Sequence, residues 1–186
     1  MVKKIKKISK EYLERAAFYY LGKYASGEGN LKHILEKKVN RAAFEGSDIS
    51  SDAPNWVNDV VAKCVKLGLA SDKSYAEMKV ISLLSQGKSI QKIKMTLFQK
   101  RVAEHIIEGI IALLKEEGAD TDLKSAQKYA KKRRFGPFRK PLLQQNELDG
   151  PALKKLQDKE IGAMIRAGFS YTITKEVLVC KEQFGI

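Results

Sequence analysis

Two stretches of the chain show the same helix signals 50 residues apart. Each stretch has a glycine after an apolar helical segment, an aspartate where the next helix would begin, and a small core-type residue beyond it. The pairs are Gly68 and Gly118, Asp72 and Asp122, and Ala76 and Ala126. One offset shared by a helix stop, a helix start and a core position indicates an internal repeat. Because a unit of this length has room for three short helices and their turns, we expect an all-α chain built from three-helix modules.

Residues 1–70 are predicted to form the first module, behind a basic N-terminal arm. Apolar residues spaced by three and four predict a helix over about 9–25, and residues 27–30 are predicted to break it. A second helix follows from Leu31, and the polar segment 45–55 is predicted to be a loop. Pro54 suits the first turn of a third helix. Trp56 is expected to anchor the core, and Cys64 lies in an apolar stripe and is expected to be a buried thiol.

Residues 71–119 form the second predicted module. Asp72 or Ser74 is expected to cap its first helix, and Gly87 to end it. Ser89 is expected to cap the second helix, and the third carries an isoleucine-rich stripe around Ile107. The segment 86–101 contains basic residues and no acid, so this module has a basic middle helix.

Residues 120–186 are predicted to form an altered third module. Its first helix covers about 121–134, a loop insertion rich in Gly and Pro follows over 136–150, and Pro151 opens the next helix. A last helix is expected around Ile173, with a short strand over 171–174 as the competing interpretation because that segment alternates. Phe169 lies 67 residues after Val102, whereas Gly168 lies 50 after Gly118. We prefer the 67-residue register because it keeps the order of the helices.

The chain is strongly basic, with 35 Lys and Arg against 22 Asp and Glu and a net charge of +13. This excess favours a polyanionic partner, which is nucleic acid rather than an anionic membrane face; a basic surface that only serves solubility is the alternative. No apolar run approaches the length of about 20 residues that spans a bilayer, and no apolar signal core follows the N-terminal lysines. The two cysteines suit a reducing, cytoplasmic setting.

Two segments concentrate the basic residues that could contact nucleic acid. Phe135 and Phe138 lie within the second segment and could either stack on bases or anchor a loop on the core. The candidates are Lys88, Lys92 and Lys94 in the first segment, and Lys128, Lys131, Lys132, Arg133, Arg134, Arg139 and Lys140 in the second.

The sequence shows no catalytic or metal-binding constellation. The segment 87–89 reads Gly-Lys-Ser like the end of a phosphate-binding loop, but Ser82 stands where that motif requires glycine, and the context is helical. His33 and His105 fall in different modules without paired cysteines, and Asp120 and Asp122 suit a helix start better than a metal. We therefore expect no enzyme, no cofactor and no bound metal.

In the order and spacing of its segments the chain resembles the RecX family of bacterial recombination regulators, from about residue 11 to 178, and especially its alphaproteobacterial members. Ala70-Ser71 departs from the acids that the family often shows after its glycine. The segments that carry the resemblance are Tyr12-Leu13 through Asn30-Leu31 with Leu35, Arg41-Ala42-Ala43 followed by a polar loop and Trp56, Leu67-Gly68-Leu69-Ala70-Ser71-Asp72 with Tyr75-Ala76, Gln86-Gly87-Lys88-Ser89, and Ile165-Arg166-Ala167-Gly168-Phe169-Ser170-Tyr171.

The resemblance implies three tandem three-helix modules in an elongated, curved, repeat-like body. It also implies a monomeric regulator without catalytic activity, which binds filaments of the recombinase RecA on single-stranded DNA, and double-stranded DNA as a further partner. Such a regulator restrains RecA's ATP hydrolysis, strand exchange and co-protease activity. Two other readings remain open from the residues: a general basic DNA-binding protein, and a helical scaffold for an acidic protein.

Overall fold

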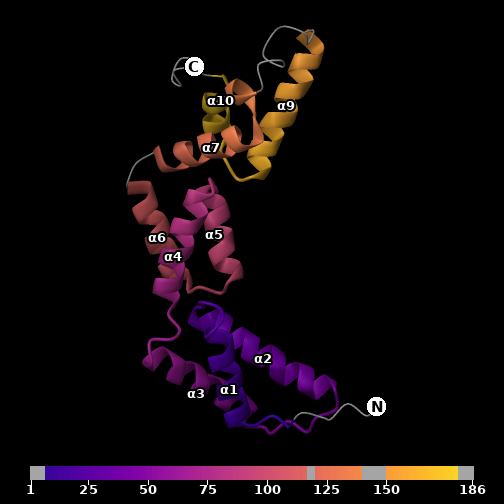
Figure 1. The fold of residues 1–186 in the computed structure, drawn as a ribbon, viewed down its shortest axis with the longest axis vertical. Helices are drawn as coiled ribbons and strands as arrows, with labels where there is room; N and C mark the ends of the chain where they lie inside the picture. Colours follow the sequence, from indigo (N-terminus) through magenta and orange to yellow (C-terminus); the bar gives the residue numbers. More distant parts are fainter. Residues whose placement is uncertain (1–6, 117–119, 140–149, 180–186) are drawn as a thin grey trace. The chain divides into compact units, whose positions relative to one another are not determined.

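The structure is a computed structural model that describes residues 7–116, 120–139 and 150–179. All regular structure within these ranges is helical and none is β-strand, which confirms the predicted all-α fold (Figure 1). The helices are α1 (Lys10–Leu21), α2 (Glu28–Phe44), α3 (Ala53–Lys66), α4 (Asp72–Ser85), α5 (Ile90–Gln99), α6 (Glu104–Glu116), α7 (Asp120–Arg133), the short 3₁₀ helix η1 (Gly136–Phe138), α9 (Gly150–Arg166) and α10 (Tyr171–Val179).

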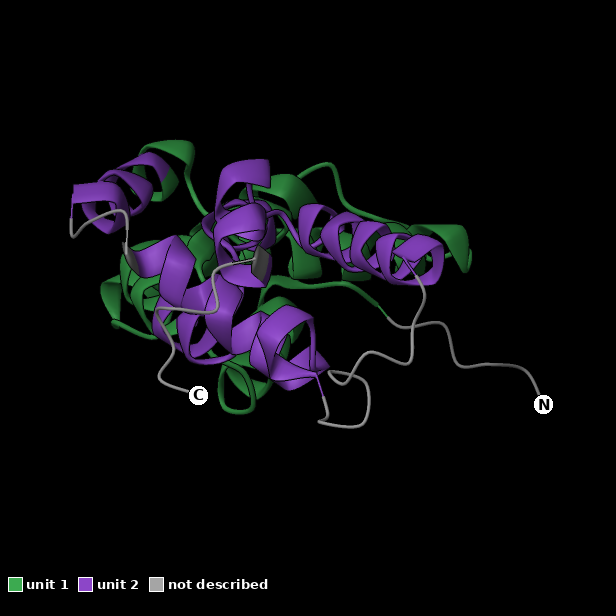
Figure 2. Ribbon diagram, turned by 90° about the horizontal axis from the view of Figure 1, so that it is seen from above, with its two compact units in different colours: residues 1–78, 97–107 green, residues 79–96, 108–186 purple. Residues whose placement is uncertain are grey.

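The chain divides into two compact units (Figure 2). Unit 1 comprises Met1–Met78 and Leu97–Ile107, and unit 2 comprises Lys79–Thr96 and Glu108–Ile186. The division passes through α4, α5 and α6, the three helices predicted for the middle module. Each unit therefore contains a terminal segment of the chain together with parts of these middle helices.

The core of unit 1 lies between α1, α2 and α3, which pack against one another. Ser9 caps α1, because its hydroxyl accepts a hydrogen bond from the Tyr12 N–H at 3.3 Å. Pro54 lies in the first turn of α3, Trp56 packs on the core and Cys64 is a buried free thiol, as predicted. The core residues that are at most 1% exposed include Leu13, Ala17, Leu31, Leu35, Val57, Val60 and Cys64.

A break separates α1 from α2, but it lies at residues 22–27 and not at the predicted 27–30, because α2 already begins at Glu28. Gly27 is its N-cap residue, and Gly29 lies within the first turn. A Cβ atom on Gly29 would lie 2.1 Å from the carbonyl oxygen of Arg101, so this glycine allows two backbone segments of unit 1 to approach closely. The predicted break itself exists, and only its position was wrong, because Gly29 serves close packing within a helix.

Asp72 does not cap its own helix. The N–H of Ser74 donates to the hydroxyl of Ser71 at 3.3 Å, so Ser71 caps α4 in place of the predicted Asp72 or Ser74. Asp72 is only 6% exposed, and its carboxylate instead accepts a hydrogen bond from the N–H of Ala103 at 2.9 Å, just before α6. Asp72 therefore joins the starts of two helices within unit 1.

Unit 2 has a core formed by α7, η1, α9 and α10. Its buried residues are Ala126, Ala130, Met164, Phe169 and Val177. The segment 171–174, for which a strand was the competing interpretation, is the first turn of α10. The hydroxyl of Ser170 caps this helix by accepting from the N–H of Ile173 at 3.2 Å, so the strand interpretation is wrong.

The turns after α5 and α9 have the same backbone structure. Arg101 and Gly168 both have positive φ, 56° and 94°. The next residues, Val102 and Phe169, are buried, and each donates its N–H to a carbonyl five residues earlier at 3.2 Å. The same turn also follows α2, α3, α4 and α7, so it does not distinguish the two registers, and the 67-residue register stays a prediction.

Substitution of Gly87 tests the close packing of unit 2. Gly87 has φ +71°, and a Cβ there would lie 2.9 Å from the Cβ of Lys128 and 3.1 Å from the carbonyl oxygen of Ser125. We expect Gly87→Ala to lower the free energy of unfolding by at least about 1–2 kcal/mol, the cost of left-handed backbone for a residue with a Cβ. The measurement is urea unfolding at equilibrium.

Gly109→Ala is the matched control, because Gly109 lies within α6 and a Cβ there meets nothing within 4 Å. We expect this change to raise the free energy of unfolding by about 0.5–1 kcal/mol, since glycine is less favourable than alanine in a helix. Equal effects of the two substitutions would contradict the close approach of Gly87 to α7.

Candidate nucleic-acid interface

The C-terminal half of α7 carries a dense group of exposed cations. Ala126 and Ala130 face the core and Tyr129 packs on it, whereas the cations of this segment are exposed. Cations in the last turn of a helix are also favoured by the partial negative charge of its free carbonyl groups. The exposed cations are Lys128, Lys131, Lys132 and Arg133, followed by Arg134 directly after the helix.

The start of α5 lies against α7 within unit 2. The N–H of Ile90 donates to the Asp122 carboxylate at 2.9 Å. The Ser89 hydroxyl accepts from the N–H of Lys92 at 3.1 Å, as predicted for a helix cap, and donates to the carbonyl of Ala167 at 2.7 Å. These bonds hold the first turn of α5 between α7 and the turn that precedes α10.

This arrangement brings two of the predicted basic segments together. Gly87 packs on the backbone and Cβ of α7 at Lys128, which places the half-buried Lys88 beside that residue. Lys92 is exposed one turn further along α5. Lys94 is exposed as well, but the described residues provide no contact that links it to α7. We call the residues Lys88, Lys92, Lys128, Lys131, Lys132, Arg133 and Arg134 the basic surface of unit 2.

Asp122 is the acid nearest to this surface in the sequence of α7. Its burial raises the pKa of the carboxyl above the ordinary value, and the hydrogen bond from Ile90 partly opposes that rise. The sequence suggested a capping role for Asp122, but not that it would act on a helix more than 30 positions earlier in the chain. Asp122 thus positions the basic residues of α5 rather than binding a ligand.

Arg139 is engaged in a nearly buried ion pair. Its guanidinium binds both carboxylate oxygens of Glu160, with Nη2–Oε2 at 2.6 Å and Nε–Oε1 at 2.9 Å. The two side chains are 11% and 6% exposed, and Oε2 also accepts from the N–H of Gly136 at 3.0 Å. This pairing gives Arg139 a structural role at the start of the predicted insertion. Lys140, the next candidate, lies outside the described residues.

Glu160, the partner of Arg139, was not among the predicted site residues, although the sequence holds a signal for it. It falls on the stripe that Leu153, Leu156 and Met164 form at helical spacing, so it is an acid on the inward face of α9. A carboxylate at such a position requires a cation or several hydrogen-bond donors. The sequence alone could have predicted a buried pair, although not its partner.

Phe135 and Phe138 pack on the core of unit 2 and are only partly exposed. The Phe135 ring lies edge-on to Tyr129, with centroids 6.3 Å apart. Tyr129 has two further contacts. Its ring centroid lies 5.6 Å from that of Phe169 and 5.6 Å from the guanidinium carbon of Arg133. The structure therefore favours the anchoring role that the sequence left open over base stacking by these two residues.

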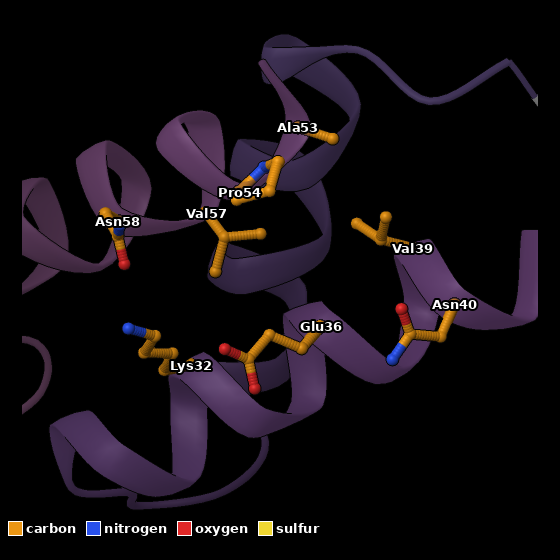
Figure 3. Close-up of a pocket in the computed structure, with 8 residues that line it drawn as sticks. All are labelled: Lys32, Glu36, Val39, Asn40, Ala53, Pro54, Val57 and Asn58. Carbon is orange, nitrogen blue, oxygen red and sulfur yellow. The ribbon is translucent and has the colours of Figure 1, made fainter. Parts of the chain in front are cut away.

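Unit 1 contains a separate open groove between α2 and α3 (Figure 3). Its volume is about 310 Å³, and its floor is apolar, with Ala53 and Val57 buried. Figure 3 shows Lys32 and Glu36 of α2 extending toward α3, with Asn58 opposite them. The groove has none of the paired nucleophile and base that catalysis requires.

The described residues also provide no metal centre and no membrane span. In the described ranges, no group of three His, Cys, Asp or Glu side chains is placed to hold a metal ion. His33 is an isolated residue whose pKa is lowered, first by burial and then by the positive charge of Arg101 and Lys37. None of the described helices is both long enough and apolar enough to cross a bilayer.

Comparisons with known proteins agree on one family. The family model described as "RecX, second three-helix domain" matches residues 71–109. The regulatory protein RecX of Myxococcus xanthus is 34% identical over 95% of this chain and 89% of its own length. The regulatory protein RecX of Agrobacterium fabrum is 36% identical over 90% of this chain and 82% of its own.

Solved structures show the same fold at lower identity. The crystal structure of RecX from Lactobacillus salivarius is 20% identical, with a TM-score of 0.62 over 90% of this chain and 93% of that one. A second crystal structure, of a regulatory protein RecX, gives a TM-score of 0.59 at 19% identity, over 90% of this chain and 70% of that one. These structures show the fold alone, whereas the sequence relatives are named as regulatory proteins and not as enzymes.

The pair of Arg139 and Glu160 can be tested by stability. We expect Glu160→Ala to lower the free energy of unfolding by about 3–5 kcal/mol, because it removes the carboxylate that binds a nearly buried guanidinium. Replacing both residues, as Arg139→Met with Glu160→Leu, should restore most of that loss. The measurement is equilibrium unfolding in urea.

Asp59→Ala is the control, because Asp59 pairs with Lys10 on the surface, where the two side chains are 56% and 43% exposed. That substitution should change the free energy of unfolding little. If Glu160→Ala were as mild as Asp59→Ala, Arg139 would be available to bind phosphate after all.

Proposed function

Because the chain belongs to the RecX family, we propose that it regulates homologous recombination and DNA repair by binding RecA filaments on single-stranded DNA. In this proposal it restrains RecA's ATP hydrolysis, strand exchange and co-protease activity, and it does so without catalytic residues or a cofactor. The observation that carries the proposal is the match, over nearly the whole chain, to relatives named as regulatory proteins. The basic surface of unit 2 supplies the physical means of contact with DNA.

The basic surface suits a nucleic-acid backbone. Its cations come from α5 and the turn before it, and from α7 with the residue after it; the segment 123–134 contains no acid. Lysine and arginine side chains that reach phosphates displace counterions, which gives an affinity that depends on charge and salt rather than on base sequence. Lys94 and Lys140 remain further candidates, whereas we assign Arg139 to its ion pair with Glu160.

A regulator of a filament gains from several weak contacts made at once. We propose three modules, over residues 1–70, 71–119 and 120–186, that act in a cytoplasmic monomer. Once one module is seated, the others bind at high effective concentration, which can raise the overall affinity by roughly 10² to 10⁴. Such a protein can regulate only if it binds the states of the filament with different affinities.

The first test is ATP hydrolysis by RecA on single-stranded DNA, measured together with filament binding at the same salt. We expect inhibition at fewer molecules of this chain than RecA protomers, and tighter binding to the filament than to bare DNA. Equal affinity for filament and bare strand, with hydrolysis unchanged, would favour the general DNA-binding protein. Binding to an acidic protein without any binding to DNA would favour the scaffold.

A second test concerns the charge of the basic surface. Replacement of Lys132, Arg133 and Arg134 by Gln should lower the affinity for single-stranded DNA. It should also reduce the slope of log affinity against log salt by about 0.7 for each phosphate contact that is lost. The measurement is fluorescence anisotropy with a labelled oligonucleotide at several salt concentrations.

The matched control removes the same charge from α2 of unit 1, by replacing Lys32, Lys37 and Lys38 with Gln. If only the total charge of the chain matters, the two triple variants will lose equal affinity and equal slope. If the basic surface binds phosphates, the variant of unit 2 will lose clearly more. An unchanged slope in the unit 2 variant would show that its cations are only solvated.

A further inference from the structure

A row of exposed side chains on α1 alternates cations with an aromatic ring. Arg15, Tyr19 and Lys23 are spaced by four residues, so they share one face of the helix and the turn that follows it. The Tyr19 side chain is 67% exposed. The Lys23 ammonium donates a hydrogen bond to the Tyr19 hydroxyl at 2.5 Å and lies 4.3 Å from the centre of the ring. The lysine therefore holds the ring in place while leaving most of it open to solvent.

Two more aromatic side chains of unit 1 lie close in sequence to this row. Phe18 is 37% exposed, and the Lys63 ammonium from α3 lies 5.9 Å from its ring. Tyr24 is 59% exposed, and its ring lies 5.2 Å from that of Tyr20. We call Arg15, Phe18, Tyr19, Lys23, Tyr24 and Lys63 the aromatic surface of unit 1.

The charge around these rings is positive. No acid occurs between Arg15 and Glu28; Glu14 is paired with Lys63 at 2.9 Å, and Glu11 lies one turn before Arg15. Lysine is depleted at the centres of protein–protein interfaces, whereas rings beside cations are the usual means of holding single-stranded nucleic acid. The cations interrupt the rings, so they do not form the continuous apolar patch that a protein or a membrane would cover.

We propose that the aromatic surface of unit 1 stacks unpaired bases of single-stranded DNA, with Tyr19 as the main platform and Arg15 and Lys23 on the flanking phosphates. The site is separate from the basic surface of unit 2, and it rests on the proposed function in taking single-stranded DNA as the partner. Stacking of this kind accepts any base, because every base has a π-face. A smaller version recurs in unit 2, where Tyr171 is 59% exposed and Lys175 lies 5.5 Å from its ring.

The experiment compares two oligonucleotides of equal length, one of thymidines and one of abasic sites, which keeps the phosphates and removes the bases. Full-length protein without RecA is titrated into each at one salt concentration, with anisotropy as the readout. Tyr19→Ala should weaken binding to the thymidine strand by about 5- to 150-fold, the range for loss of one stacked base. Its affinity for the abasic strand should stay unchanged. Tyr19→Phe loses the hydrogen bond from Lys23 but keeps the ring and the cation beside it, so it should retain most of the affinity for the thymidine strand.

Phe44→Ala is the control for loss of an exposed ring. Phe44 is 94% exposed in the same unit, and the ring–cation contacts among the described residues do not include it. This substitution should leave affinity for both strands unchanged. Thermal unfolding of each variant, followed by circular dichroism, confirms that differences in binding come from folded protein.

Two outcomes overturn the inference. One is unchanged affinity of Tyr19→Ala for the thymidine strand, and the other is an equal loss on the thymidine and abasic strands. Because RecA is absent, the result is independent of the proposed regulation. If the chain inhibits RecA but its Tyr19→Ala variant binds the thymidine strand normally, only the stacking surface is rejected. If Tyr19→Ala loses affinity for the thymidine strand alone but the chain has no effect on RecA, only the proposed regulation is rejected.

Discussion

The free N–H groups at helix starts are the constraint on which both units depend. Helix starts leave backbone donors without partners, and a buried donor must find an acceptor. In this chain two aspartates at the repeat spacing supply distant acceptors: Asp72 binds the N–H of Ala103 in unit 1, and Asp122 binds that of Ile90 in unit 2. Each bond fixes one end of a middle helix on a helix that begins elsewhere in the sequence. The place of the basic residues on α5 follows from the second bond.

The sequence predicted the parts of the fold that depend on local interactions. The periodic apolar positions, the cap at Ser89 and the helix end at Gly87 need only neighbouring residues, and all three were confirmed. It failed where a residue acts on a distant segment. Gly29 looked like a helix break because its contact with the Arg101 carbonyl is about 70 positions away, and Asp72 looked like a local cap for the same reason.

The candidate site shows the same limit. Counting cations identified the basic segments, but it could not separate cations that face solvent from one that is neutralised inside the fold. Arg139 and Arg134 lie five positions apart, yet one is bound by a nearly buried carboxylate and the other is exposed. Phosphate binding needs a cation that is not already paired with a carboxylate. The exposed cations of α7 are therefore better candidates than Arg139, which follows η1.

The backbone at Arg134 strengthens this distinction. Helices α3, α4 and α9 are followed by left-handed glycines, Gly68, Gly87 and Gly168, whereas α5 and α7 are followed by arginines with φ of 56° and 57°. A side chain in this conformation costs roughly 1–2 kcal/mol relative to glycine. At Arg101 this conformation occurs where the residue's own carbonyl packs against Gly29. For Arg134 the adjoining feature is the run of exposed cations that ends α7. Selection for stability alone would favour glycine at position 134. Selection for binding would instead keep the strained arginine, because it adds charge to a charged surface.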